Sequence, residues 1–188
     1  MGPTPQGRVY SYVGPAEIPA YGGEPQGFSV RSAEELADAL DRLGSPEGCT
    51  LTFVVDAGGI LLVADRHSEH VNCAGGQPVL SAGELTVART SGGVEVTDLT
   101  NQSTGYCPEP DSWVALERAI PDGVTRPDYW TMEFTFRRCP KCEAINIVKE
   151  GFFFCGVYDS VLAKHPSRGH SVLKTVGTRR GPGLGRTA

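Results

Sequence analysis

The side chains best suited to chemistry are three cysteines in the stretch CPKCEAINIVKEGFFFC. Two residues separate Cys139 from Cys142, and twelve separate Cys142 from Cys155. Thiolates at this spacing can share one metal ion while nearby backbone N–H groups donate to the sulfurs. Position 158 would supply a fourth sulfur, but Tyr158 stands there, and a phenol keeps its proton at neutral pH. The sequence therefore predicts a metal site made by the three cysteines, with Asp159 as the fourth ligand.

The residues around these cysteines are typical of short strands. Residues 144–148 (AINIV) and 151–155 (GFFFC) are β-prone and are predicted to pair as a hairpin across a turn that contains glycine. The segment from about 134 to 160 resembles a zinc ribbon that lacks one of its four ligands. This resemblance implies a zinc cofactor with a structural role, and the three cysteines as its ligands.

Two alternatives to this ligand set remain open. More distant residues could supply the fourth ligand, and the candidates are Cys73, Cys107, His165 and His170. The hairpin could also be free of metal, because cysteine behaves as a small apolar side chain when it is buried.

A second group of potential ligands lies in the stretch ADRHSEHVNC, directly after an apolar strand. His67, His70 and Cys73 are spaced by three residues, so one helical turn would bring them onto one face. Such a group could bind a second metal ion or act as an acid–base cluster, although an ordinary solvated loop explains the same composition. The predicted binding residues are Asp65, Arg66, His67, His70 and, from the next polar loop, Tyr106.

That next loop, NQSTGYCPEP, contains a candidate nucleophile. Cys107 precedes an expected helix start, and a thiol in such a position can be activated by a neighbouring base. His67 or His70 would be that base, and this is the Cys–His arrangement that the sequence offers for catalysis. A turn that caps the helix accounts for the same residues without catalysis.

The elements that must position these groups are short helices and hairpins. Ser32 and Glu35 form a capping box, which predicts a helix that continues to the stop at Gly44. A second helix is expected from residues 111–112 until Pro121 ends it. The strand pairs TLTFVVD with ILLVAD, and ELTVAR with VEVTDL, are each joined by a loop that contains glycine.

Runs of strands without alternating helices predict an α+β fold with a small antiparallel sheet. The stretch YWTMEFTFRRC is expected to be a fifth strand that leads into the cysteine hairpin. The predicted organisation is a flexible Pro/Gly-rich arm (1–27), an α+β core (28–133), the ribbon-like hairpin (134–163) and a basic, largely disordered tail (164–188).

Composition limits the possible partners. The chain has a net charge of −5, yet the tail from Lys164 onward holds six basic residues and no acid. The acidic body argues against binding of nucleic acid. The sequence contains no run of about 18 apolar residues, so no membrane-spanning helix is predicted. The N-terminus lacks the pattern of a secretory signal. These features predict a cytoplasmic protein with reduced thiols, and the ratio of 13 arginines to four lysines is typical of a GC-rich bacterial genome.

Two functions are compatible with these observations. The first is a small cytoplasmic binding or adaptor protein, whose body is stiffened by the ribbon-like hairpin and meets a protein partner. The alternative is a hydrolase or transferase that uses Cys107 with His67 or His70. The two differ in geometry, because the enzyme requires a histidine within hydrogen-bonding reach of Cys107 inside a pocket.

Overall fold

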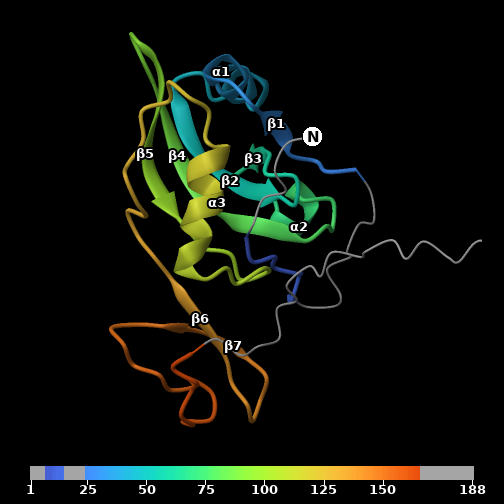
Figure 1. The fold of residues 1–188 in the computed structure, drawn as a ribbon, viewed down its shortest axis with the longest axis vertical. Coiled ribbons are helices and arrows are strands. Elements are labelled where there is room, and N and C mark those ends of the chain that lie inside the picture. The colour runs from blue at the N-terminus through green and yellow to red at the C-terminus, as the bar shows by residue number, and fades with distance from the viewer. Residues whose placement is uncertain (1–6, 15–23, 166–188) are drawn as a thin grey trace, which may run out of the picture.

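The computed structural model describes residues 7–14 and 24–165, and it shows the α+β fold that the sequence predicts (Figure 1). A five-stranded antiparallel sheet has the strand order β1-β3-β2-β4-β5, and β6 and β7 form a separate two-stranded sheet. The strands are β1 (Phe28–Val30), β2 (Gly48–Asp56), β3 (Leu61–Asp65), β4 (Val79–Thr90), β5 (Gly93–Thr100), β6 (Thr135–Arg138) and β7 (Ile145–Val148). The helices are α1 (Ala33–Arg42), α2 (His70–Cys73), the 3-10 turn η1 (Pro110–Ser112) and α3 (Trp113–Ala119).

Both hairpins of the large sheet lie where the sequence predicts them, since β2 pairs with β3 and β4 pairs with β5. In the connection between β2 and β3, the Asp56 carboxylate accepts hydrogen bonds of 2.8 Å from the backbone N–H groups of Gly58 and Ile60. Gly59 follows with a φ of 84°, a conformation that glycine adopts without steric cost. The loop satisfies its own backbone groups, and it thereby fixes the register of two central strands.

The fifth strand of the large sheet differs from the expected one. It is β1, which pairs antiparallel with β3. Of the stretch YWTMEFTFRRC, only β6 is a strand, and β6 pairs with β7 outside the large sheet. The residues before β6 run beside β5, where Thr125 and Met132 make isolated parallel bridges. Pro127 lies between these two bridges and has no N–H to donate, so this segment cannot form a continuous ladder.

Helix α1 begins and ends as the sequence predicts, with one difference at its cap. The Ser32 hydroxyl accepts a hydrogen bond of 3.2 Å from the backbone N–H of Glu35. The Glu35 carboxylate accepts from the backbone N–H of Arg31, at 2.6 Å, and not from that of Ser32. Gly44 follows the helix with a φ of 72°, the left-handed conformation that ends many helices.

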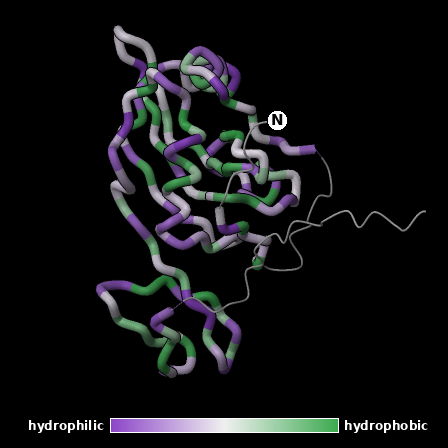
Figure 2. Tube along the Cα trace, in the orientation of Figure 1, coloured by the Kyte–Doolittle hydropathy of each residue, from purple (hydrophilic) through white to green (hydrophobic). Residues whose placement is uncertain are grey.

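One face of the large sheet packs against α1 and α3. Leu40 of α1 and Phe53 of β2 are both fully buried in the hydrophobic cluster of this face. Two indole rings belong to this cluster, and those of Trp113 and Trp130 lie edge to face with centroids 5.2 Å apart. This cluster is the main core of the molecule, and the apolar stretches of the tube in Figure 2 follow its strands.

The opposite face of the sheet carries a smaller cluster. Val54, next to Phe53 in β2, points to this side, as the alternation of a strand requires. Here Cys73 of α2 and the rings of Tyr10 and Tyr106 are completely buried. Both faces of the sheet are therefore covered, although α2 has only four residues.

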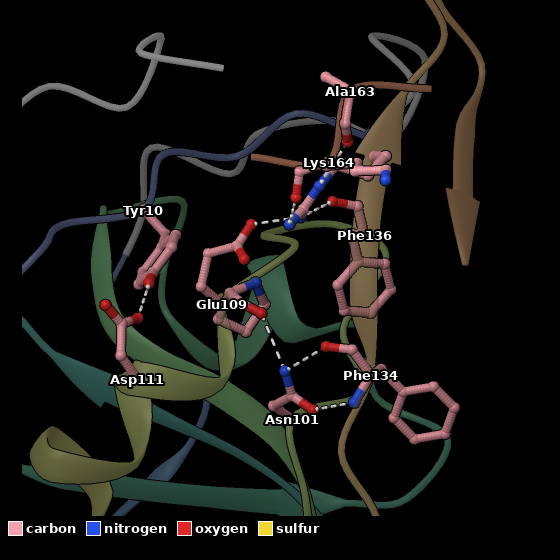
Figure 3. Close-up of polar contacts among 10 residues, drawn as sticks. Tyr10, Asn101, Glu109, Asp111, Phe134, Phe136, Ala163 and Lys164 are labelled. Atoms are coloured by element: carbon pink, nitrogen blue, oxygen red, sulfur yellow. Dashed lines mark hydrogen bonds and ion pairs between the residues drawn. The ribbon is translucent and has the colours of Figure 1, made fainter. Parts of the chain in front are cut away.

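The N-terminal arm packs more closely than the sequence suggests. Tyr10 exchanges two backbone hydrogen bonds with Val79, of 2.8 and 2.9 Å, and its side chain is fully buried. Its hydroxyl donates to the Asp111 carboxylate at 3.2 Å (Figure 3). The expectation of a loose arm over residues 1–27 is therefore wrong for this part, because one large aromatic ring outweighs the surrounding Pro and Gly residues. Residues 1–6 and 15–23 of the arm lie outside the described residues.

The C-terminal lobe, residues 135–165, projects from one end of the large sheet (Figure 1). Asn101 joins it to the body, because its amide donates to the carbonyls of Pro108 and Phe134 and its oxygen accepts from the N–H of Phe134 (Figure 3). The buried Arg137 side chain makes an ion pair of 2.8 Å with Glu109 of the body. Arg137 also donates to the carbonyls of Ala163 and Lys164, so it ties both ends of the lobe together.

The pairing inside this lobe corrects one prediction. The sequence predicts that 144–148 pairs with 151–155, but β7 pairs with β6, and residues 152–155 make only the isolated bridges Lys149↔Phe152 and Phe154↔Val161. The cause is the turn at Cys139–Cys142, which reverses the chain directly from β6 into β7. Of the predicted basic tail, residues 166–188 lie outside the described part of the chain.

The core assignment can be tested at Leu40. We expect Leu40→Ala to lower the free energy of unfolding by about 2–5 kcal/mol, because it removes a fully buried side chain and leaves a cavity. The exposed Asp38 of the same helix is the matched control, and Asp38→Ala should change stability by less than about 0.5 kcal/mol. Equal effects of the two substitutions in denaturant unfolding would show that α1 does not bury this face.

Candidate metal site

One side of the site is formed by the turn that joins β6 to β7, which we call the first turn. The backbone N–H of Cys139 donates to the carbonyl of Ala144 at 2.9 Å, and the N–H of Glu143 donates to the carbonyl of Cys139 at 3.0 Å. Inside the turn, the N–H of Lys141 points at Cys139 Sγ at 3.4 Å. Glu143 takes a left-handed φ of 60°. This backbone path brings Cys139 and Cys142 to the same side of the turn.

The other side of the site is formed by a second turn, at Cys155–Tyr158, which has the same pattern of hydrogen bonds. The N–H of Cys155 donates to the carbonyl of Ser160 at 2.9 Å, and the N–H of Asp159 donates to the carbonyl of Cys155 at 3.0 Å. The N–H of Val157 lies 3.4 Å from Cys155 Sγ, and Asp159 has a left-handed φ of 45°. Tyr158 therefore holds the position in this turn that Cys142 holds in the first turn.

The three sulfurs meet between the two turns. The Sγ atoms of Cys139, Cys142 and Cys155 all lie within 4.8 Å of one another, and Cys142 Sγ is 3.6 Å from Cys155 Sγ. Tetrahedral bonds of about 2.3 Å from one ion to two sulfurs would place those sulfurs about 3.8 Å apart. The spacing therefore fits a single metal ion, and this lobe is compatible with a zinc-ribbon-like segment.

The environment of Cys139 favours its thiolate. The Ser160 hydroxyl lies 3.2 Å from Cys139 Sγ and, together with backbone N–H groups of the turn, lowers the pKa of Cys139 to about 6. The pKa of Cys142 is shifted in the opposite direction from its ordinary value. A backbone contact from Ala144 favours its thiolate, but burial and the two neighbouring sulfurs outweigh this contact and raise the pKa. Between Cys139 and Cys142, the surroundings of Cys139 therefore favour the thiolate that binds a cation.

The predicted fourth ligand, Asp159, does not join this group. Its side chain is exposed, and among the residues described the group of mutually close ligand atoms consists of the three cysteines. Tyr158 is 60% exposed, so its ring does not lie among the sulfurs. Asp159 as a ligand stays a prediction that would need its side chain to turn inward. Of the more distant candidates, Cys73 and Cys107 belong to the body, the exposed His165 is not among the mutually close ligand atoms, and His170 lies outside the described residues.

The polar group around residues 65–73 does not assemble a second metal site within the described ranges. The helical turn that the spacing suggested does form, as α2, but its members face different surroundings. His70 Nε2 is 3.0 Å from the carbonyl oxygen of Gly83, and burial lowers the pKa of His70. The thiol of Cys73 faces the carbonyl of Leu62 inside the core, and burial raises its pKa to about 12. His67 is exposed.

The other members of this predicted binding surface serve the backbone or the core. The carboxylate of Asp65 accepts from the backbone N–H of His67 at 2.8 Å, which closes the turn after β3. The carbonyl of Arg66 accepts from the hydroxyl of the buried Thr52. The ring of Tyr106 is fully buried, and its hydroxyl donates to the carbonyl of Gln77 at 2.8 Å. These contacts are structural, and binding by this surface stays a prediction.

Cys107 lies in surroundings that disfavour a nucleophile. Its thiol donates to the carbonyl of Thr104 at 3.2 Å, and burial raises its pKa to about 12. Neither His67 nor His70 is a hydrogen-bond partner of Cys107 in the described part of the chain. A cavity of about 330 Å³ lies elsewhere, beside α3 and Tyr10, and Cys107 does not line it. The enzyme alternative requires a histidine within hydrogen-bonding reach of Cys107 inside a pocket, and the arrangement of these residues does not meet that requirement.

Two residues of the lobe that matter were not singled out from the sequence. Ser160 follows Cys155 by five residues, as Ala144 follows Cys139, and the matching hydrogen bonds of the two turns show this correspondence. In the sequence, Arg137 is one charged residue among several. Its buried ion pair with Glu109 in the structure shows that it anchors the lobe.

No family model, curated protein or solved structure matches this chain in the three comparisons made. Within the described residues, no helix is long and apolar enough to cross a membrane.

The equivalence of the two turns predicts the effect of one substitution. Tyr158→Cys should place a fourth sulfur opposite the other three, and it should tighten metal binding because four thiolates then complete the tetrahedron. The affinity can be measured by competition with a chromogenic chelator. Val157→Cys, one residue earlier in the same turn, is the control and should leave the affinity unchanged. If the two variants had equal metal affinities, or if neither bound metal more tightly than the wild type, the two turns would not be equivalent.

Proposed function

We propose that this chain is a small protein-binding adaptor of the cytoplasm in which a zinc ion, bound by Cys139, Cys142 and Cys155, shapes a C-terminal docking lobe. The observation that carries the proposal is the close approach of three sulfurs from two equivalent turns. Zinc is the preferred ion because thiolate-rich tetrahedral sites of this spacing suit Zn²⁺, which has no redox chemistry of its own. Cys139, Cys142 and Cys155 are free of disulfides, so their thiolates are available to a metal ion.

The role of the ion follows from the size of the lobe. Its hydrophobic cluster has only three buried members, Cys139, Cys155 and Leu162, with Cys142 and Phe153 packed against them. A unit of about 30 residues with so small a core usually needs a metal or disulfides to hold its fold. The binding energy of zinc would therefore be folding energy for the lobe.

The lobe also carries an unusual amount of exposed apolar surface. Five large apolar side chains within ten residues are 42–70% exposed, and they are Phe152, Phe154, Val157, Tyr158 and Val161. Phe152 and Phe154 lie with ring centroids 4.8 Å apart. Clustered exposed apolar residues of this kind mark surfaces that bind other proteins. We call these five residues the apolar patch.

Charge indicates what kind of partner suits the apolar patch. Residues 28–133 hold 17 acidic and six basic residues, whereas residues 134–163 hold three acidic and four basic residues. The nearly neutral lobe therefore stands on a strongly acidic body, which would repel nucleic acid. The occupant that fits is a protein segment with an apolar, weakly charged face, since burial of apolar area then drives association.

Metal content tests the first half of this proposal. Full-length protein purified under reducing conditions without chelators should contain close to one zinc per chain by elemental analysis. Cys142→Ser should lose that zinc, because one of three sulfurs is removed from the ion. Cys49→Ser, a cysteine of β2 outside the site, is the matched control and should retain the metal. Wild-type protein without bound metal would end the proposal.

Site-specific crosslinking in cells tests the docking half. A photoreactive amino acid at Val157, which is 70% exposed, should crosslink to another protein, and Cys142→Ser should abolish the crosslink by unfolding the lobe. The same amino acid at the exposed Glu34 of α1 is the control and should give no such product. Equal products at both positions, or a product made of two copies of this chain, would contradict an adaptor that docks a different protein.

A further inference from the structure

The strongest further observation concerns the fourth ligand of the proposed metal site. Ser160 is buried, with 9% of its surface exposed, and its Oγ lies 3.2 Å from Cys139 Sγ. We infer that Ser160 Oγ is the fourth ligand of the ion, so that the site is a three-sulfur, one-oxygen tetrahedron. This inference rests on the proposed metal site and adds to it a ligand that the cysteine spacing does not suggest.

The direction of the Ser160 side chain follows from the turn that carries it. Cys155 and Ser160 face each other across the second turn, where the N–H of Cys155 donates to the carbonyl of Ser160. Residues opposite each other on antiparallel chains point to the same side. Both side chains are buried, whereas the neighbouring pair Phe154 and Val161 is exposed. Ser160 therefore points to the inner side of the lobe, where the sulfurs lie.

Two opposite edges agree with a tetrahedron that includes Ser160. Cys142 Sγ and Cys155 Sγ, 3.6 Å apart, form one edge, and Cys139 Sγ and Ser160 Oγ, 3.2 Å apart, form the opposite edge. An ion with bonds of about 2.3 Å to sulfur and about 2.0 Å to oxygen requires edges of about 3.8 and about 3.5 Å. Both observed edges lie within a few tenths of an ångström of these lengths.

The other candidates in the second turn point away. Tyr158, which replaces the expected cysteine, is 60% exposed, and Asp159 is also exposed. Asp159 corresponds to Glu143 of the first turn, which takes the same left-handed conformation and is exposed as well. Ala144, the counterpart of Ser160, has no side-chain atom that could bind an ion. The second turn thus replaces the missing sulfur by an oxygen two residues further on.

A simpler role for Ser160 is donation of a hydrogen bond to the Cys139 thiolate. A double substitution separates the two roles. If Ser160 is a ligand, Ser160→Ala should weaken Co²⁺ and Zn²⁺ binding by about 10-fold or more. In a Tyr158→Cys background the fourth position is filled by sulfur, so Ser160→Ala should then have little effect. A hydrogen-bond donor to Cys139 would matter equally in both backgrounds.

The experiment is a titration of the full chain with Co²⁺, followed by displacement with Zn²⁺, for the four combinations of these two substitutions. Asp159→Asn is the control for a change next to Ser160 and should leave the cobalt spectrum and the affinity unchanged. Ser160→Cys is a second readout, because it should add the charge-transfer absorption of a fourth thiolate even if Ser160→Ala folds poorly.

The outcomes are distinct. A large loss in the wild-type background and none with Tyr158→Cys supports Ser160 as a ligand. Equal losses in both backgrounds, no loss in either, or an unchanged cobalt spectrum for Ser160→Cys overturns the inference while the three-cysteine site stands. If the wild-type chain binds neither ion, the proposed function itself fails.

Discussion

The C-terminal lobe depends on holding together two turns, Cys139–Cys142 and Cys155–Tyr158, that have almost no hydrophobic core between them. Each turn satisfies its own backbone groups, but hydrogen bonds within a turn do not join it to the other turn. The groups that do meet are three sulfurs and the Ser160 hydroxyl, and the N–H of Gly156 in the second turn also donates to the Asn146 side chain of β7 at 3.1 Å. In water, thiolates brought this close would repel one another, so a cation between them changes a destabilising contact into the main stabilising one. Under the proposed function, the exposed apolar patch of the same lobe has a defined shape only if this contact holds.

The body of the molecule does not share this dependence. Its sheet is covered on both faces, and the larger cluster alone includes more than twenty buried side chains. Body and lobe meet through polar contacts, chiefly the amide of Asn101 and the buried ion pair of Arg137 with Glu109. Burial raises the pKa of Glu109 against the opposing effect of the Arg137 charge, so the cost of burying the carboxylate outweighs the attraction of the guanidinium. Such contacts fix the direction of the lobe relative to the sheet, but they cannot fold it.

The parts of this structure that depend on local signals could be predicted from the sequence. The hairpins follow from alternating apolar residues and glycine loops, and α1 follows from Ser32 and the stop at Gly44. The parts that depend on distant contacts could not. The burial of Tyr10 depends on Val79 and Asp111, far away in sequence. The pairing of β6 with β7 is local, but it was not predicted because residues 151–155 are an equally β-prone partner for β7. The three cysteines were identified by spacing, whereas Ser160 was missed because its importance appears only when the two turns are compared by their hydrogen bonds.

The central claim is that one metal ion holds the two turns together while the sheet stands alone. Hydrogen–deuterium exchange of the zinc-loaded full chain, before and after a chelator is added, tests it most directly. The account predicts that the amides of Lys141, Glu143, Val157 and Asp159 lose protection together after chelation, because their bonds belong to the two turns. The amides of β2 and β4 should exchange as slowly as before. Protection in the turns that chelation leaves unchanged, or a loss that spreads equally through the large sheet, would contradict the account.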